Sequence, residues 1–177
     1  CFNNDLVTPE EPVIEKASEP NWLTLPESSE KSLEKTFSRT QAIFRFYGGT
    51  INLNKWYWDW SQGFVSVNAS ITFEPGFYDQ NVYGGWYKYI TLTVDDETCT
   101  STFSPHMDFL KPATYNVTYS GIDLSGVNPD NIDFVYQAED GSVQNLQYDR
   151  IEVDIQEGLL KVVNAKIPHF SRFGFVN

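Results

Sequence analysis

The residues with the clearest potential for binding chemistry form an aromatic run at positions 54–64. Trp56, Trp58 and Trp60 stand at every second position, so any strand that forms there carries the three indoles on one face. Such a row can form a flat aromatic platform for stacking sugar rings. Polar neighbours would then supply hydrogen bonds to the sugar: Asn54, Asp59 and Gln62.

The same run permits two other interpretations. Trp and Tyr dominate the energetics of protein interfaces, so the three tryptophans, together with Tyr57 and Asp59, are also candidates for contact with a protein partner. Alternatively, the indoles pack between two sheets as part of the core. A second aromatic cluster occurs at positions 83–87.

The first residue, Cys1, precedes a polar, proline-containing stretch without an apolar run. This opening resembles that of mature bacterial lipoproteins, in which a signal peptide is removed directly before a cysteine that is then acylated. The resemblance implies a membrane anchor through lipid on Cys1 and a place in the bacterial cell envelope, such as the outer membrane, on its periplasmic or cell-surface side. The alternative is a disulfide between Cys1 and Cys99 in a secreted protein.

Other reactive side chains form no recognisable catalytic or metal-binding pattern. His106 and His169 are far apart and lack neighbouring ligands, and the acidic groups do not match a spaced calcium loop. The chain has no G-x-S-x-G elbow, phosphate-binding glycine loop or H-E-x-x-H motif. We therefore predict a protein that is not an enzyme and uses no metal or cofactor.

Charge and composition narrow the partners further. The chain has 24 acidic and 12 basic residues and a net charge of −12, which repels nucleic acid and excludes it as a partner. No run reaches the roughly 18 to 20 apolar residues of a membrane helix, so membrane contact must come through a lipid or another protein. The 13 Phe, 10 Tyr and 5 Trp favour strands over helices.

The chain divides into a tail and a domain. Residues 1–36 are acidic and proline-rich, and they predict a lipid-proximal tether with one short helix candidate at Ser28–Phe37. Trp22, Leu23 and Leu25 are exceptions in this tail that we expect to dock on the domain or on a partner.

Residues 37–177 alternate apolar and polar side chains between turn signals. This pattern predicts an all-β fold, an antiparallel β-sandwich of about eight or nine strands with an extended N-terminal tail. The first expected strand begins at Thr40. The others are expected at 64–73, 87–94, 114–119, 132–137, 147–155, 159–165 and 170–176.

Several short segments occur in the order seen in a known domain family. They are Gly48-Gly49-Thr50, ASITFEPG at 69–76, ITLTV at 90–94, TFSPH at 102–106, FLKPA at 109–113 and HFSRF at 169–173. Residues 48–177 thereby resemble the β-sandwich domain shared by ankyrins, netrin receptors and zonula occludens proteins, although Met107 replaces a usual glycine. The resemblance implies a scaffold for protein interaction and mechanical coupling.

The resemblance also raises one chemical possibility. In some relatives of this domain a His-Phe-Ser tripeptide cleaves itself, the serine hydroxyl attacking the preceding carbonyl with assistance from the histidine. Here the tripeptide is His169, Phe170 and Ser171, with cleavage at Phe170-Ser171. The competing interpretation is structural: the tripeptide opens the final strand, and Phe170 and Phe173 fill the core.

Together these observations predict a non-catalytic cell-envelope lipoprotein that acts as an accessory or structural subunit and presents an aromatic surface to a protein partner. The first alternative is a carbohydrate-binding surface lipoprotein that uses Trp56, Trp58 and Trp60. The second is a domain that cleaves itself at Phe170-Ser171.

Overall fold

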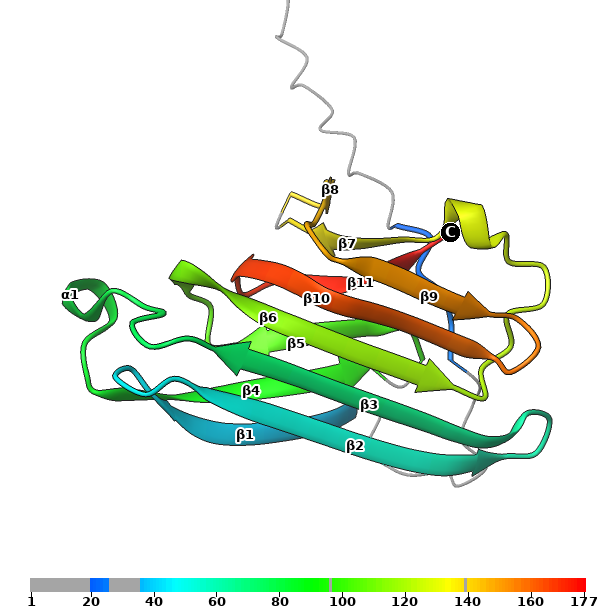
Figure 1. Cartoon of the computed structure of the whole chain (residues 1–177), viewed down its shortest axis with the longest axis horizontal. Coiled ribbons are helices and arrows are strands. Elements are labelled where there is room, and N and C mark those ends of the chain that lie inside the picture. The colour runs from blue at the N-terminus through cyan, green and yellow to red at the C-terminus, as the bar shows by residue number, and fades with distance from the viewer. Residues whose placement is uncertain (1–19, 26–35, 96, 139) are drawn as a thin grey trace, which may run out of the picture.

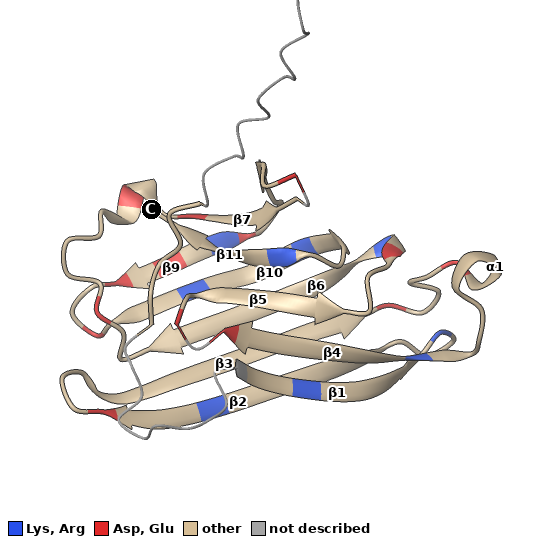
Figure 2. Ribbon diagram, turned by 180° about the vertical axis from the view of Figure 1, so that it is seen from behind, with Lys and Arg blue, Asp and Glu red and all other residues tan. Residues whose placement is uncertain are grey.

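Two antiparallel sheets packed face to face make up the body of the protein (Figure 1). The computed structural model describes residues 20–25, 36–95, 97–138 and 140–177. The six-stranded sheet has the order β1-β4-β5-β11-β7-β8, and the five-stranded sheet has the order β2-β3-β6-β10-β9. The first sheet faces the viewer in Figure 2 and the second in Figure 1.

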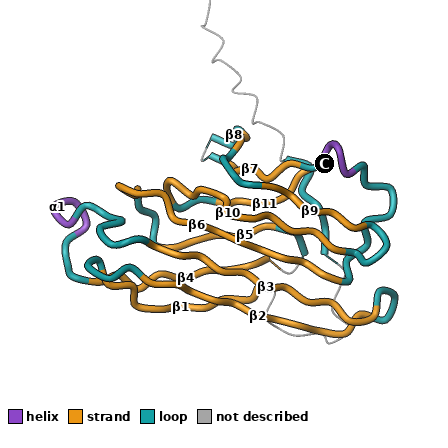
Figure 3. Tube along the Cα trace, in the orientation of Figure 1, coloured by secondary structure: helices purple, strands orange, loops and turns teal. Residues whose placement is uncertain are grey.

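Strands account for most of the described residues, with one helical turn and one 3-10 turn in the connections (Figure 3). The elements are β1 (Thr36–Phe44), β2 (Gly49–Asp59), β3 (Gly63–Phe73), α1 (Gln80–Tyr83), β4 (Tyr87–Asp95), β5 (Thr100–Ser104), β6 (Asp108–Ser120), η1 (Pro129–Asn131), β7 (Asp133–Gln137), β8 (Val143–Asn145), β9 (Arg150–Asp154), β10 (Leu159–His169) and β11 (Arg172–Val176).

The prediction of an all-β antiparallel sandwich is confirmed. The described residues form eleven strands rather than eight or nine, because β2, β5 and β8 were not assigned from the sequence. The final strand begins at Arg172, two residues later than expected. The helix predicted at 28–37 lies mostly outside the described residues, and its last two residues belong to β1.

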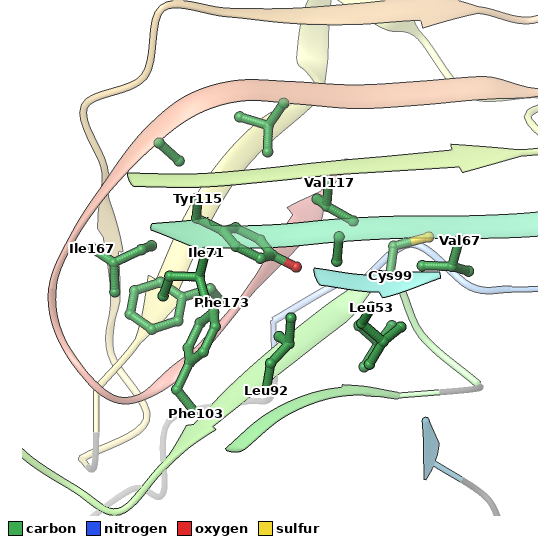
Figure 4. Close-up of a cluster of buried hydrophobic side chains, with 14 of the residues drawn as sticks. Leu53, Val67, Ile71, Leu92, Cys99, Phe103, Tyr115, Val117, Ile167 and Phe173 are labelled. Atoms are coloured by element: carbon green, nitrogen blue, oxygen red, sulfur yellow. The ribbon is translucent and has the colours of Figure 1, made fainter. Parts of the chain in front are cut away.

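Aromatic rings and aliphatic side chains fill the space between the sheets. Figure 4 shows Leu53, Val67 and Tyr115 of the five-stranded sheet pointing toward Leu92 and Phe103 of the six-stranded sheet. These side chains are at most 6% exposed, as expected for a closely packed interior.

One polar link crosses this core. Ser101 Oγ of β5 lies 2.6 Å from the Tyr115 hydroxyl of β6, and burial raises the pKa of that hydroxyl. The hydrogen bond satisfies both polar groups where no water reaches them, so it connects the two sheets at a fixed position.

The segment Pro20–Leu25 also belongs to the sandwich. The Leu23 N–H donates to Phe175 O at 2.9 Å, Leu23 O accepts from the Cys99 N–H at 2.7 Å, and the Leu25 N–H donates to Glu97 O at 2.9 Å. Trp22, Leu23 and Leu25 are 9%, 9% and 6% exposed, which confirms that these residues dock on the domain. The predicted tether 1–36 therefore contains a segment that pairs with residues 97–99 and with the end of β11.

Gly121, directly after β6, lets that strand end against β3. It has φ +74°, and a Cβ atom there would lie 2.1 Å from Phe64 O. Gly126 has a similar φ of +81°, but a Cβ atom there would meet no atom within 4 Å. Replacing either glycine by alanine would strain the backbone, because both lie in the left-handed region. Only at Gly121 would the added Cβ atom also clash with the backbone of a neighbouring strand.

We predict that Gly121→Ala lowers the free energy of unfolding by about 3 kcal/mol or more, against about 1 to 2 kcal/mol for Gly126→Ala. Urea denaturation followed by tryptophan fluorescence measures both. Equal losses for the two variants would show that the contact with Phe64 O contributes nothing.

Candidate functional site: an aromatic patch beside an uncharged sheet face

Strand β2 presents its tryptophans to solvent. Trp56 and Trp58 are 69% and 55% exposed on the outer face of the five-stranded sheet, and Trp60, in the turn that follows, is 85% exposed. Tyr57 and Asp59 alternate with them and point inward, at 9% and 7% exposed. The interpretation of the indoles as core residues is therefore wrong, and the interpretations as a binding surface remain.

A fourth aromatic residue completes this surface. Phe64 of β3 stands directly opposite Trp58 in the antiparallel register, is 55% exposed, and stacks on Trp56 with ring centroids 5.9 Å apart and planes at 25°. We call Trp56, Trp58, Trp60 and Phe64 the aromatic patch. In the sequence Phe64 ends the aromatic run 54–64 and begins a predicted strand. Recognising this run as the turn of a hairpin, with Trp56 and Trp58 in the first arm and Phe64 in the second, would have revealed its cross-strand pairing with the tryptophans.

Polar uncharged side chains continue the same face beyond the patch. The strands β2, β3 and β6 are paired side by side, and their outward-facing residues form rows across the sheet. The first row consists of Trp56, Ser66 and Ser120. The remaining rows are Asn54-Asn68-Thr118, Asn52-Ser70-Asn116 and Thr50-Thr72-Thr114. We call these Asn, Ser and Thr residues the polar face. None of its members is charged, and Figure 2 shows β3 as a strand without a basic or acidic residue.

Most side chains of the polar face have unused hydrogen-bonding capacity. Asn52, Asn54 and Asn68 make no side-chain hydrogen bond within the part of the chain that the structure describes. The Thr50 and Thr72 hydroxyls pair at 2.9 Å, and Asn116 Oδ1 accepts from the Asn164 N–H at 2.9 Å. The face therefore offers amide and hydroxyl groups of both donor and acceptor character to a ligand.

Charged groups begin on β10, directly beside β6. Lys166 Nζ donates to the Thr114 hydroxyl at 3.0 Å, and Lys161 stands opposite Thr118. Glu152 of β9 accepts from Arg150 Nε at 2.7 Å and from Lys161 Nζ at 3.1 Å. The hydrogen bonds from Arg150 and Lys161 lower the pKa of Glu152. The polar face thus lies between the aromatic patch and a small ion-paired cluster.

Asp59 points inward and stabilises the turn that carries Trp60, so it is not part of the exposed surface of the patch. Its carboxylate Oδ1 accepts from the Ser61 hydroxyl at 2.6 Å and from the N–H groups of Ser61 and Gln62, each at 2.7 Å. These hydrogen bonds close the turn that carries Trp60, and the Ser61 hydroxyl and the Gln62 N–H lower the pKa of Asp59. Tyr57 packs beside Phe37 of β1, with centroids 6.1 Å apart. Both residues were expected to contact a ligand with the tryptophans, and the structure places them on the opposite face.

The His-Phe-Ser tripeptide lies at the turn between β10 and β11 and does not open the final strand. Phe170 is fully buried, and its ring lies 4.7 Å from Phe109 and 5.5 Å from Phe103, so its predicted core role is confirmed. The Ser171 hydroxyl donates to Gln137 O at 2.6 Å, and the His169 ring packs against Tyr136 at 4.9 Å. The tripeptide therefore joins strand β7 to the core. The Ser171 hydroxyl, which self-cleavage would need as the nucleophile, is hydrogen-bonded to the backbone of β7.

Cys1 lies outside the described residues, and Cys99 is a fully buried free thiol whose pKa is raised by burial. Within the described ranges, no three His, Cys, Asp or Glu side chains gather closely enough to hold a metal ion. The same part of the chain contains no helix of the length and apolarity needed to cross a membrane.

Comparison with known proteins adds no relative. No protein-family model, no curated protein and no solved structure matches this chain. The resemblance to the domain of ankyrins, netrin receptors and zonula occludens proteins stays a prediction, and the interpretation of the site depends on the geometry above.

We predict that Asp59→Asn destabilises the protein at neutral pH and that this loss disappears in acid. A carboxyl whose pKa is lowered by folding from its ordinary value of 3.8 stabilises the fold above that value, and the stabilisation is lost as the pH falls through the lowered pKa. Melting temperatures of both proteins between pH 7 and pH 2 measure the difference. A gap that stayed constant over this range would show that the charge of Asp59 has no role.

Proposed function

We propose that this protein is a non-catalytic, lipid-anchored binding module of the bacterial cell envelope whose aromatic patch and polar face bind a neutral glycan. The observation that carries the proposal is the combination on one sheet face of four exposed aromatic side chains with rows of Asn, Ser and Thr that contain no charge.

The chemistry of the face suits sugars in three respects. Exposed indoles such as Trp56 and Trp58 offer apolar ring faces for stacking against pyranose rings. The amides and hydroxyls of the polar face can both donate to and accept from sugar hydroxyls. Because the rows of the polar face contain no charge, an uncharged polyol can bind there without displacing water from ions, and the nearest charged groups are Lys161 and Lys166 at its β10 edge.

A protein partner is the second candidate. Trp56, Trp58 and Phe64 form a contiguous aromatic cluster, and clusters of this composition dominate the binding energy of many protein interfaces. The predicted domain resemblance also points to protein interaction, in which case the chain would act as an accessory or structural subunit of an envelope complex. In that arrangement the partner would cover the whole aromatic patch.

Because Pro20–Leu25 already pair with the sandwich, the part of the chain that would link a lipidated Cys1 to the domain is shorter than the predicted tether of 36 residues.

We predict that the full chain binds neutral oligosaccharides on a glycan array and that Trp56→Ala weakens this binding at least tenfold, because it removes the stacking partner of both Phe64 and the sugar. The matched control is Trp86→Ala, which removes an equally exposed indole, 71% exposed, located before β4 on the other sheet. The control should bind as the unchanged protein does, and isothermal titration should give the affinities.

A blank array would contradict the glycan proposal. Photo-crosslinking from position 58 in the native envelope would then test the second candidate, which requires one protein to be captured reproducibly and to be lost with Trp56→Ala. A non-catalytic module also requires that the bound oligosaccharide keep its mass after long incubation.

The anchor has its own test. We predict that intact-mass analysis of the native protein purified from its membranes shows a gain matching acyl chains on Cys1, and that Cys1→Ser releases the protein from the membrane fraction. An unmodified mass two hydrogens short would instead indicate a disulfide between Cys1 and Cys99.

A further inference from the structure

A second polar site lies on the outer face of the six-stranded sheet, away from the aromatic patch. A pocket of about 250 Å³ opens over β4, β5 and β11 and is lined by Thr93, Asp95, Thr100, Thr102 and Arg172. Strand pairing brings these residues together, because Thr93 stands opposite Thr102 and Thr102 stands opposite Arg172. All five lining residues are polar, so the pocket suits a hydrophilic ligand.

The Arg172 guanidinium is fixed at one end of this pocket. Its Cζ lies 5.3 Å from the centre of the Trp22 ring, and its Nε and Nη2 donate to the hydroxyls of Thr100 and Thr98, each at 3.4 Å. Within the described residues it forms no ion pair, although the chain carries a net charge of −12. A preoriented guanidinium with remaining N–H groups is the preferred protein partner of a carboxylate.

The Asp95 carboxylate lies at the other end of the pocket. Its hydrogen bonds orient the hydroxyls of Thr98 and Thr100. Its Oδ1 accepts from the N–H groups of Glu97 and Thr98, each at 2.9 Å, and from the Thr98 hydroxyl at 3.1 Å. Because the Thr98 hydroxyl donates to Asp95, its oxygen accepts from the Thr100 hydroxyl, 2.8 Å away. These donors partly balance the charge of Asp95, and Oδ2 remains to accept from a ligand.

The spacing of the two charged groups defines the length of the ligand. Arg172 Nη2 lies 3.4 Å from the Thr98 hydroxyl, and Asp95 Oδ1 lies 3.1 Å from the same oxygen, so the two charged groups are at most about 6.5 Å apart. The hydroxyls of Thr93 and Thr102 lie between them and have no side-chain partner in the described ranges. A matching ligand therefore has an anionic acceptor at one end and hydroxyl groups along the rest.

We propose that this pocket, which we call the Arg172 pocket, binds the acidic unit of a sugar, with the carboxylate on Arg172 and the ring hydroxyls on Thr93, Thr102 and Asp95. A volume of about 250 Å³ lies below the range of about 300 to 1,000 Å³ typical for drug-sized ligands, so it suits a single sugar unit. A single negative charge fits one guanidinium, whereas a phosphate dianion would face Asp95 with one cation to balance it.

The Arg172 pocket is independent of the neutral-glycan proposal. It lies on the other sheet and shares no residue with the aromatic patch or the polar face. Loss of binding at one site leaves the other unchanged, so the two proposals fail separately.

The test is titration of the full chain with D-glucuronate, D-glucose and acetate, followed by calorimetry and by amide shifts in two-dimensional NMR. We expect D-glucuronate to bind most tightly and to shift Thr93 and Thr102, with binding weakened by salt. Arg172→Gln should weaken glucuronate binding at least tenfold, since it removes a charge-assisted pair of hydrogen bonds. Arg39→Gln, which removes an exposed arginine of the same sheet that does not line the pocket, should leave it unchanged.

Arg172 also packs on Trp22, so its replacement could disturb the fold. Thr102→Val provides the second variant, because Thr102 is exposed, has no hydrogen-bond partner in the described ranges, and keeps its branched shape. We expect it to weaken glucuronate binding at least threefold with an unchanged melting temperature. Equal affinity for glucose or for acetate, shifts located elsewhere, or the same loss with Arg39→Gln would overturn the proposal.

Discussion

The packing of aromatic rings between the two sheets is the constraint on which every surface of this protein depends. Phe170 contacts Phe73, Phe103 and Phe109, so it joins β3, β5 and β6 at the centre of the core. Side chains on a strand alternate between faces, and a slip of one residue would exchange the buried set for the exposed set. Large rings on the inner positions make such a slip costly and thereby fix which side chains face solvent.

This register creates two outer faces with different chemistry. On β2, burying Tyr57 and Asp59 requires Trp56 and Trp58 to point outward, next to the uncharged rows of β3 and β6. On the other sheet, burying Phe173 directs Arg172 outward, where it meets Thr102 of β5. Apart from Trp60, which lies in the turn after β2, both proposed sites are built from strands, and this favours rigid geometry in each.

The sequence predicts the sandwich well because its signals are local. Alternation at residues 64–73 and 87–94 and glycine turns such as Gly84-Gly85 identify strands without knowledge of their partners. Strand β2 was missed because its aromatic residues are apolar on both faces at Trp56, Tyr57 and Trp58, which hides the alternation. The polar face and the Arg172 pocket could not be predicted, since both arise from pairing between strands that are distant in sequence, such as Arg172 with Thr102.

The distribution of charge explains how an acidic protein can carry a large uncharged polar surface. A net charge of −12 keeps the molecule soluble, and an exposed group of four aromatic residues needs that protection against self-association. Acidic side chains such as Asp123 and Asp140 lie in the connections, where backbone N–H groups satisfy them. If charge were instead placed on the rows between Trp56 and Thr72, a neutral ligand would have to displace water from ions, at a larger cost than from amides and hydroxyls. Charged residues therefore occur in the connections and in most of the other strands, whereas the rows that form the polar face contain none.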